Sequence, residues 1–135
     1  MTVDIPTHWL TVLEALRNRG VQFLISGSAA DAIVEGNPET APALVLAPSP
    51  FRRNLDRLAK ALADLGVPDA DRVVNHPAVR WQFALDGLTL NVIGSAVGDG
   101  EFSIRVWRTR PVTLVAGDSS LQCEVEFANE FTHAG

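Results

Sequence analysis

The sequence predicts an α+β fold built around a mixed β-sheet, and three observations support this prediction. In the first half of the chain, segments with helical periodicity alternate with short apolar runs. After Pro68 the apolar residues recur at every second position, which is typical of antiparallel strands. The run at residues 43–47 lacks polar alternation, which indicates a strand buried on both faces. The predicted order is helix, strand, helix, strand, helix and then several antiparallel strands.

Residues 7–19 form the first predicted helix. Apolar side chains recur there every three or four positions, at Trp9, Leu10, Val12, Leu13 and Leu16. Thr7 is the predicted N-cap, since its side-chain oxygen can accept a hydrogen bond from a free amide of the first turn. Gly20 follows the last apolar position and predicts a left-handed C-terminal cap.

Two short strands and one short helix follow. Residues 21–25 are rich in Val, Phe and Ile, which favours a strand, and Ser26-Gly27-Ser28 ends it. A short helix is predicted over residues 29–35, closed by Gly36-Asn37-Pro38. The apolar run at residues 43–47 is too short for a helix and predicts a second strand.

A third helix is predicted to begin at Ser49-Pro50, because a capping side chain followed by proline is typical of a helix start. One apolar stripe runs along this helix, made of Phe51, Leu55, Leu58, Leu62 and Leu65. Gly66 follows the stripe and predicts the end of the helix.

The second half of the chain predicts antiparallel strands and turns. Asp86-Gly87 is a two-residue hairpin turn between alternating strands at residues 79–85 and 88–92. Residues 94–101 are rich in glycine and predict a loop. The remaining predicted strands span residues 104–107, 112–116 and 121–127.

Composition limits the class of protein. The 135 residues are 47% apolar and 20% charged with a net charge of −5, which predicts one domain over residues 1–135 and excludes a disordered polar chain. The sequence shows no membrane span and no signal peptide. A single cysteine, Cys123, excludes an internal disulfide. We expect a cytoplasmic protein, or an intracellular or virion component, and the acidic balance argues against a nucleic-acid partner.

The turn after the first strand is the segment most informative about function. A strand that enters Gly27-Ser28 at a helix start is a generic anion site, because glycine lets a phosphate approach the backbone and the free amides favour negative charge. The same residues are also the ordinary composition of a tight strand-to-helix turn. Gly27 and Ser28 are therefore candidate nucleotide-binding residues, with the tight turn as the alternative.

A wider pattern surrounds this turn. A leading helix ends in Gly20-Val21, the segment Leu24–Ala30 follows, and Thr40, a second strand and the helix after Ser49 complete the order. Over about residues 10–95 this arrangement resembles the nucleotidyltransferase-like superfamily, especially the small bacterial minimal nucleotidyltransferases and the AbiEii-type toxins. The resemblance implies a nucleotidyltransferase-like mixed sheet with helices packed on it, followed by antiparallel strands, and a bacterial or phage source.

The resemblance also implies three carboxylates that hold two Mg²⁺ ions beside a nucleotide. Two would be aspartates, spaced D-x-D, on the strand after Thr40, but Pro42 and Leu44 occupy these positions. Shifted alignments give Ala41 with Ala43, or Ala43 with Val45. The third carboxylate would fall at Asn91. Neutral side chains cannot balance the charge of the metal ions, so the sequence predicts no catalytic or metal-binding residue at these positions.

Three acidic residues near the turn are candidates for relocated metal ligands, namely Asp31, Glu35 and Glu39. Asp31 and Glu35 are four positions apart and can share one helix face. An active transferase built on them would need Mg²⁺ and a nucleoside triphosphate, whereas no cofactor is expected otherwise. The alternative interpretation is a solvated acidic face.

A basic stripe on the third predicted helix is a candidate contact face for phosphates or an acidic partner, made of Arg52, Arg53, Arg57 and Lys60. Asp56 and Asp64 interrupt it, which also fits a solvated face. The histidines, His8, His76 and His133, have no metal-ligand spacing. Cys123 lies in an alternating strand and is predicted to be core, whereas Trp81 and Trp107 predict core or interface positions.

Three functions are therefore considered. The first is a pseudoenzyme, a nucleotidyltransferase-like domain without the catalytic aspartates that acts through binding or regulation, with a protein partner or a second copy of itself. The second is an active Mg²⁺-dependent nucleotidyltransferase with relocated ligands. The third is a structural or assembly subunit of a larger complex, including a viral one, that associates through the strands predicted at residues 103–127.

Overall fold

Seven strands form one mixed sheet in the computed structural model, which describes residues 1–75, 80–94 and 101–127. The strands are β1 (Thr2–Asp4), β2 (Phe23–Ile25), β3 (Leu44–Pro48), β4 (Arg80–Leu85), β5 (Leu88–Ile93), β6 (Thr109–Ala116) and β7 (Ser119–Glu126). The helices are α1 (Thr7–Asn18), α2 (Gly27–Val34), α3 (Arg52–Asp64), α4 (Arg72–Asn75) and α5 (Glu101–Val106), with a 3₁₀ turn, η1, at Pro38–Thr40. The predicted α+β class with a mixed sheet is confirmed.

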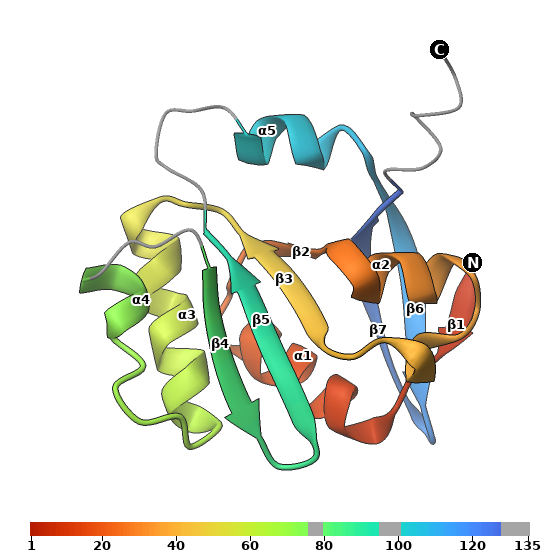
Figure 1. Ribbon diagram of the computed structural model, residues 1–135, viewed down its shortest axis with the longest axis horizontal. Helices are drawn as coiled ribbons and strands as arrows, with labels where there is room; N and C mark the ends of the chain where they lie inside the picture. The colour runs from red at the N-terminus through yellow and green to blue at the C-terminus, as the bar shows by residue number, and fades with distance from the viewer. Residues whose placement is uncertain (76–79, 95–100, 128–135) are drawn as a thin grey trace.

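The sheet has two halves, in the overall order β1-β6-β7-β2-β3-β5-β4 (Figure 1). In one half, β2 is antiparallel to β3, β3 is parallel to β5, and β4 closes the edge against β5. In the other half, β6 and β7 form a long antiparallel hairpin, and β1 pairs with β6 in parallel. The single pair Ile25↔Val125 joins β2 to β7, so the two halves meet at one point and diverge from it.

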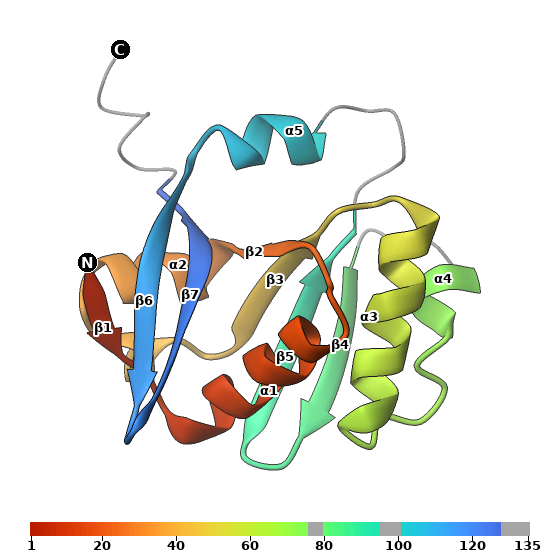
Figure 2. The same ribbon diagram turned by 180° about the vertical axis from the view of Figure 1, so that it is seen from behind.

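Helices cover both faces of the sheet. Figure 2 shows α1 and α3 on one face, and Figure 1 shows α2 on the other, against β3 and β7. The predicted apolar positions of α1 are all buried, namely Trp9, Leu10, Val12, Leu13 and Leu16. The buried side chains of α1 and α3 pack against the strand side chains that point toward these helices. Together they form the main core.

Three locally encoded elements match their predictions. The helix predicted at residues 7–19 is α1, and Gly20 after it has φ +71°, as a left-handed cap requires. The third predicted helix is α3, which ends just before Gly66. The hairpin predicted at Asp86-Gly87 joins β4 to β5, and Trp81 and Phe83 of β4 face the core.

The predicted capping residues are wrong. Thr7 is the first residue of α1, Pro6 occupies the N-cap, and no side chain caps the helix. Helix α3 begins at Arg52 after an N-cap Phe51, so Ser49-Pro50 precedes it. The Ser49 carbonyl accepts a hydrogen bond from the Asn54 side chain, and this serine is 2% exposed. Phe51, predicted to belong to the apolar stripe, is 64% exposed.

The strand predicted at residues 104–107 is also wrong, because helix α5 ends at Val106 and a turn follows. The short elements β1 and α4 were not predicted. The loop predicted at residues 94–101 lies mostly outside the described residues. Strand β6 lies between β1 and β7, and β7 lies between β6 and β2, to which it is joined by the single pair Ile25↔Val125.

No helix among the described residues is long and apolar enough to cross a membrane.

Candidate functional site

The Gly27 turn joins β2 to α2 near the middle of the sheet. Gly27 has φ +58°, in the left-handed region that favours glycine. A Cβ atom built on Gly27 would lie 3.3 Å from Cγ1 of Val45 on β3. The backbone conformation and the close approach of β3 therefore both favour glycine here, independently of any phosphate.

The strand face beside this turn carries neutral side chains. Val45 pairs with Asn91 of β5 in parallel register, so the two side chains share one face of the sheet. Val45 is buried, and Oδ1 of the half-buried Asn91 has no hydrogen-bond partner within the described residues. This pair offers no carboxylate to a metal ion beside Gly27.

The register of β3 distinguishes between the alignments that place the two family aspartates at Pro42 and Leu44 or at Ala43 and Val45. Pro42 is exposed and precedes β3, and Leu44 is fully buried on the strand face opposite to that of Val45. The alignment with Ala43 and Val45 is the one whose strand residue lies against Gly27. Neither Ala43 nor Val45 carries a carboxylate, and the same is true of Pro42 and Leu44 in the other alignment.

A buried polar cluster lies on the other side of the turn. Ser26 occupies the N-cap position of α2, but its hydroxyl makes no capping bond and instead donates a 2.5 Å hydrogen bond to Oε1 of Glu126. Nη1 of Arg105 lies 3.1 Å from that Oε1 atom and 3.2 Å from Oγ of Ser26. Ser26 is 1% exposed and Glu126 is 5% exposed, so water is excluded from most of the ion pair. The cluster ties the start of α2 to β7 and α5.

A cavity of about 290 Å³ opens beside this cluster, lined in part by Ser26, Gly27, Asp31, Arg105, Arg108 and Glu126. The two arginines and the two carboxylates cancel in formal charge. A nucleoside triphosphate is a multiply charged anion that needs an excess of positive charge around it. The lining by itself does not supply that excess.

Only one of the proposed relocated ligands, Asp31, lines this cavity. Glu35 caps the end of α2 and Glu39 lies in η1, and both are exposed. Within the part of the chain that the structure describes, no group of three or more His, Cys, Asp or Glu side chains is placed to hold a metal ion.

The predicted basic face is exposed on α3, with Arg52, Arg53, Arg57 and Lys60 at its surface. Acidic groups lie among these residues, since Asp56 and Asp71 line a cavity of about 460 Å³ together with Arg52 and Lys60. At the end of α3, Asp64 accepts a 2.6 Å hydrogen bond from Nε of Arg19. The face therefore has mixed charge, which favours the interpretation as a solvated surface.

The remaining candidates divide between core and surface. Cys123 is buried as predicted, and burial raises the pKa of its thiol to about 12. Trp81 belongs to the core, whereas Trp107, after α5, is 84% exposed and does not. His8 is exposed, and His76 and His133 lie outside the described residues.

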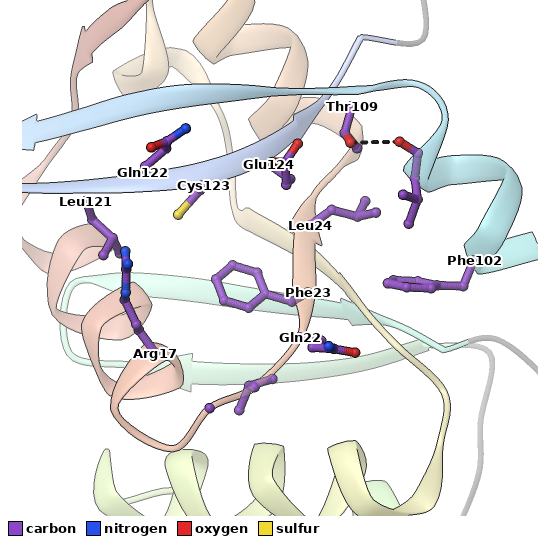
Figure 3. Close-up of a pocket in the computed structure, with 13 residues that line it drawn as sticks. Arg17, Gln22, Phe23, Leu24, Phe102, Thr109, Leu121, Gln122, Cys123 and Glu124 are labelled. Atoms are coloured by element: carbon purple, nitrogen blue, oxygen red, sulfur yellow. Dashed lines mark hydrogen bonds between the residues drawn. The ribbon is translucent and has the colours of Figure 1, made fainter.

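A larger cavity of about 780 Å³ lies where β2 and β7 diverge (Figure 3). Its apolar lining comes from both strands and from α5, and includes Phe23, Leu24, Phe102, Val106, Leu121 and Cys123. Arg17 of α1 and Glu124 of β7 also line it. The sequence did not indicate this cavity, because its walls come from segments far apart in the chain.

Sequence reasoning also missed Arg105 and Glu126. Glu126 is the last residue of β7, in which Leu121, Cys123 and Val125 point inward, so the alternation predicts an exposed side chain at this position. Its hydrogen-bond partner Ser26 is 100 positions away, and no local pattern connects the two.

No protein-family model matches the chain. No curated protein and no solved structure matches it either.

Proposed function

We propose that this protein is a nucleotidyltransferase-like domain that does not transfer nucleotides and acts by binding a protein partner. The observation that supports this most directly is the pairing of Val45 and Asn91 beside the Gly27 turn. The family resemblance implies metal-binding carboxylates on these two strands. An apolar side chain packed against the turn, with an amide beside it, supplies no negative charge to hold Mg²⁺.

The strand order is compatible with the proposed fold. The antiparallel pair β2/β3 and the parallel pair β3/β5 bring the turn after β2 beside residues of β3 and β5. A metal-dependent transferase needs its phosphate turn and its metal ligands in this kind of proximity. The shared face of Gly27, Val45 and Asn91 therefore supports the family resemblance, while its chemistry argues against transfer.

The polar cluster gives a second argument against triphosphate binding. The Ser26 hydroxyl and the Arg105 guanidinium are both engaged with Glu126 at the mouth of the cavity. An incoming phosphate would have to compete with a buried carboxylate for Arg105 and would meet its negative charge. This arrangement favours a structural role for Arg105 over phosphate recognition.

The partner-binding part of the proposal depends on the surface of the segment after α5. Trp107 is 84% exposed and its neighbour Val106 is 47% exposed. Tryptophan is enriched among the residues that dominate protein interfaces, and here it stands beside a second exposed apolar side chain. We assign Trp107 as the centre of the protein contact, with either another protein or a second copy as its occupant.

The enzymatic alternative is favoured by one observation, the position of Asp31 in the cavity beside Gly27. Incubation of the full chain with radiolabelled nucleoside triphosphates and Mg²⁺, with protein, RNA and small-molecule acceptors present, separates the two functions. The pseudoenzyme is expected to incorporate no label above a heat-denatured control. Turnover that is lost in Asp31→Asn and retained in Glu35→Gln, a matched change on the same helix outside the cavity, would establish the enzyme instead.

The assembly alternative and the contact at Trp107 are tested together by sedimentation velocity at increasing protein concentration. Self-association that Trp107→Ala abolishes would identify a second copy as the partner. Self-association that persists in this variant would favour an assembly subunit that pairs elsewhere, for example through the edge strands β1 and β4.

A further inference from the structure

We propose that α5 is a strap that the polar cluster of Ser26, Arg105 and Glu126 holds against the sheet, and that this strap opens as a unit while the sheet stays folded. Trp107 follows α5 directly, so opening of the strap moves the most exposed large apolar side chain of the described residues. This inference goes beyond the proposed function and does not rest on it, because it depends only on contacts within this chain.

Helix α5 is weakly joined to the apolar core. Phe102 and Arg105 are half-buried and Val106 is exposed, so none of the side chains that the structure describes in α5 is buried. By contrast, α1, α2 and α3 each bury four or more side chains. Because burial of an apolar face is what mainly stabilises a helix in a protein, a segment with few buried apolar contacts is expected to open locally.

Two cavities border α5. Phe102 and Val106 line the cavity of about 780 Å³, and Arg105 lines the cavity of about 290 Å³ beside Gly27. Figure 3 shows the ring of Phe102 extending from α5 toward Leu24, another residue that lines the larger cavity. A helix with open space beside it has few atoms in van der Waals contact, so its displacement loses little dispersion energy.

The polar cluster supplies the attachment that packing does not. Nη1 of Arg105 donates a 3.1 Å hydrogen bond to Oε1 of Glu126 and lies 3.2 Å from Oγ of Ser26. Ser26 precedes α2 and Glu126 ends β7, and both side chains are buried. Hydrogen bonds between charged groups are strong where water is excluded, so one side chain of α5 attaches the helix to two other elements.

The chain joins the sheet directly after Trp107. The Phe127 amide donates a 2.7 Å hydrogen bond to the Arg108 carbonyl, which extends the β6–β7 ladder to this point. On the other side of Trp107, the Arg108 amide donates a 2.9 Å hydrogen bond to the Arg105 carbonyl. The backbone is therefore fixed in the sheet from Arg108 onward, and the turn at Trp107 is the pivot of the strap.

The test is hydrogen exchange of the full chain at increasing urea concentrations below the unfolding transition, followed by mass spectrometry of peptic fragments. Amides of α5 are expected to exchange at least about tenfold faster than those of β7, at a rate that urea hardly changes, because a local opening exposes little surface. Amides of β7 are expected to exchange through global unfolding, which urea strongly promotes. No partner is present, so the result does not depend on the proposed protein contact.

Two variants weaken the attachment. Arg105→Ala removes the ion pair, and Glu126→Gln removes it while keeping the size of the side chain, so the second variant gives the result if the first does not fold. Each is expected to raise the exchange rate of α5 by about tenfold or more, because breaking a buried ion pair is strongly destabilising. Asp64→Asn removes an exposed ion pair with Arg19 and is expected to leave this rate within about twofold.

Three results would overturn the proposal. If α5 and β7 exchange at the same rate and with the same dependence on urea, α5 opens only when the whole sheet unfolds. If α5 exchanges without protection in the unsubstituted chain, the polar cluster does not hold it closed. If neither Arg105→Ala nor Glu126→Gln changes the exchange of α5 by more than about twofold, the attachment lies elsewhere.

Discussion

Substitution of Gly27 by alanine is expected to lower the free energy of unfolding by about 2–3 kcal/mol, in two separable parts. The first part is conformational, because φ at Gly27 is +58° and this region costs an L-residue roughly 1–2 kcal/mol. The second part is steric, because the new Cβ would lie 3.3 Å from Cγ1 of Val45. Contacts this tight force small shifts in a packed core, which adds roughly 1 kcal/mol.

A matched glycine separates the two parts. Gly36 also has a positive φ, +80°, but a Cβ built there would meet nothing within 4 Å. Gly36→Ala is therefore expected to cost only the conformational part, about 1–2 kcal/mol. In a double-mutant cycle, Val45→Ala relieves the clash, so Gly27→Ala is expected to cost about 1 kcal/mol less in that background.

The assay is urea-induced unfolding followed by tryptophan fluorescence and far-ultraviolet circular dichroism, which gives the free energy of unfolding and its dependence on urea. Coincident transitions of the two signals would establish two-state behaviour. Equal losses in Gly27→Ala and Gly36→Ala, with no coupling between Gly27 and Val45, would refute the packing explanation for this glycine.

Three further predictions concern polar contacts. Arg105→Ala leaves the buried carboxylate of Glu126 without its ion pair. The free energy of unfolding in urea is expected to fall by about 3 kcal/mol, and a fall of less than about 1 kcal/mol would contradict this. Asn54→Ala removes three hydrogen bonds between the side chain and the backbone. The free energy of unfolding in the same assay is expected to fall by about 2–4 kcal/mol, whereas an unchanged urea midpoint would show that water replaces these bonds. The hydrogen bond from Arg19 lowers the pKa of the Asp64 carboxyl below its ordinary 3.8, so its stabilising effect is complete above that value and disappears as the pH falls through the lowered pKa. Asp64→Asn is accordingly expected to destabilise slightly near neutral pH and not in strong acid, and equal losses at both would contradict the assignment.

The elements that could be predicted from sequence are those whose cause is local. Helix α1 buries one periodic face and ends at Gly20, and the β4–β5 hairpin follows from alternation around Asp86-Gly87. In both cases the residues that determine the element are neighbours in the chain. No distant contact was needed to assign them.

The elements that were missed or misassigned depend on distant contacts. Strand β1 is three residues long and exists through its parallel pairing with β6, more than 100 positions away. The segment of α5 contains alternating Ile and Val residues that favour a strand, yet it is helical, and Arg105 from it reaches Ser26 and Glu126. Tertiary contacts decide the conformation of such short segments over their intrinsic preference.

In the candidate site, too, the features determined by neighbouring residues could be predicted, and those that depend on distant contacts could not. The Gly27 turn and the neutral positions after it could be identified from order and spacing. The residue that packs on the turn, Val45, required the register of β3, since a shift by one residue exchanges the two faces of a strand. The Ser26–Glu126 contact required the position of β7 in the sheet.

The central claim is that the Gly27 turn has no metal-binding chemistry, and it is tested most directly by calorimetric titration of a nucleoside triphosphate with and without Mg²⁺. We expect no binding at millimolar nucleotide, or weak binding whose affinity is the same within about twofold when Mg²⁺ is removed. An affinity that Mg²⁺ raises by about tenfold or more, and that Asp31→Asn returns to the metal-free value, would contradict the claim.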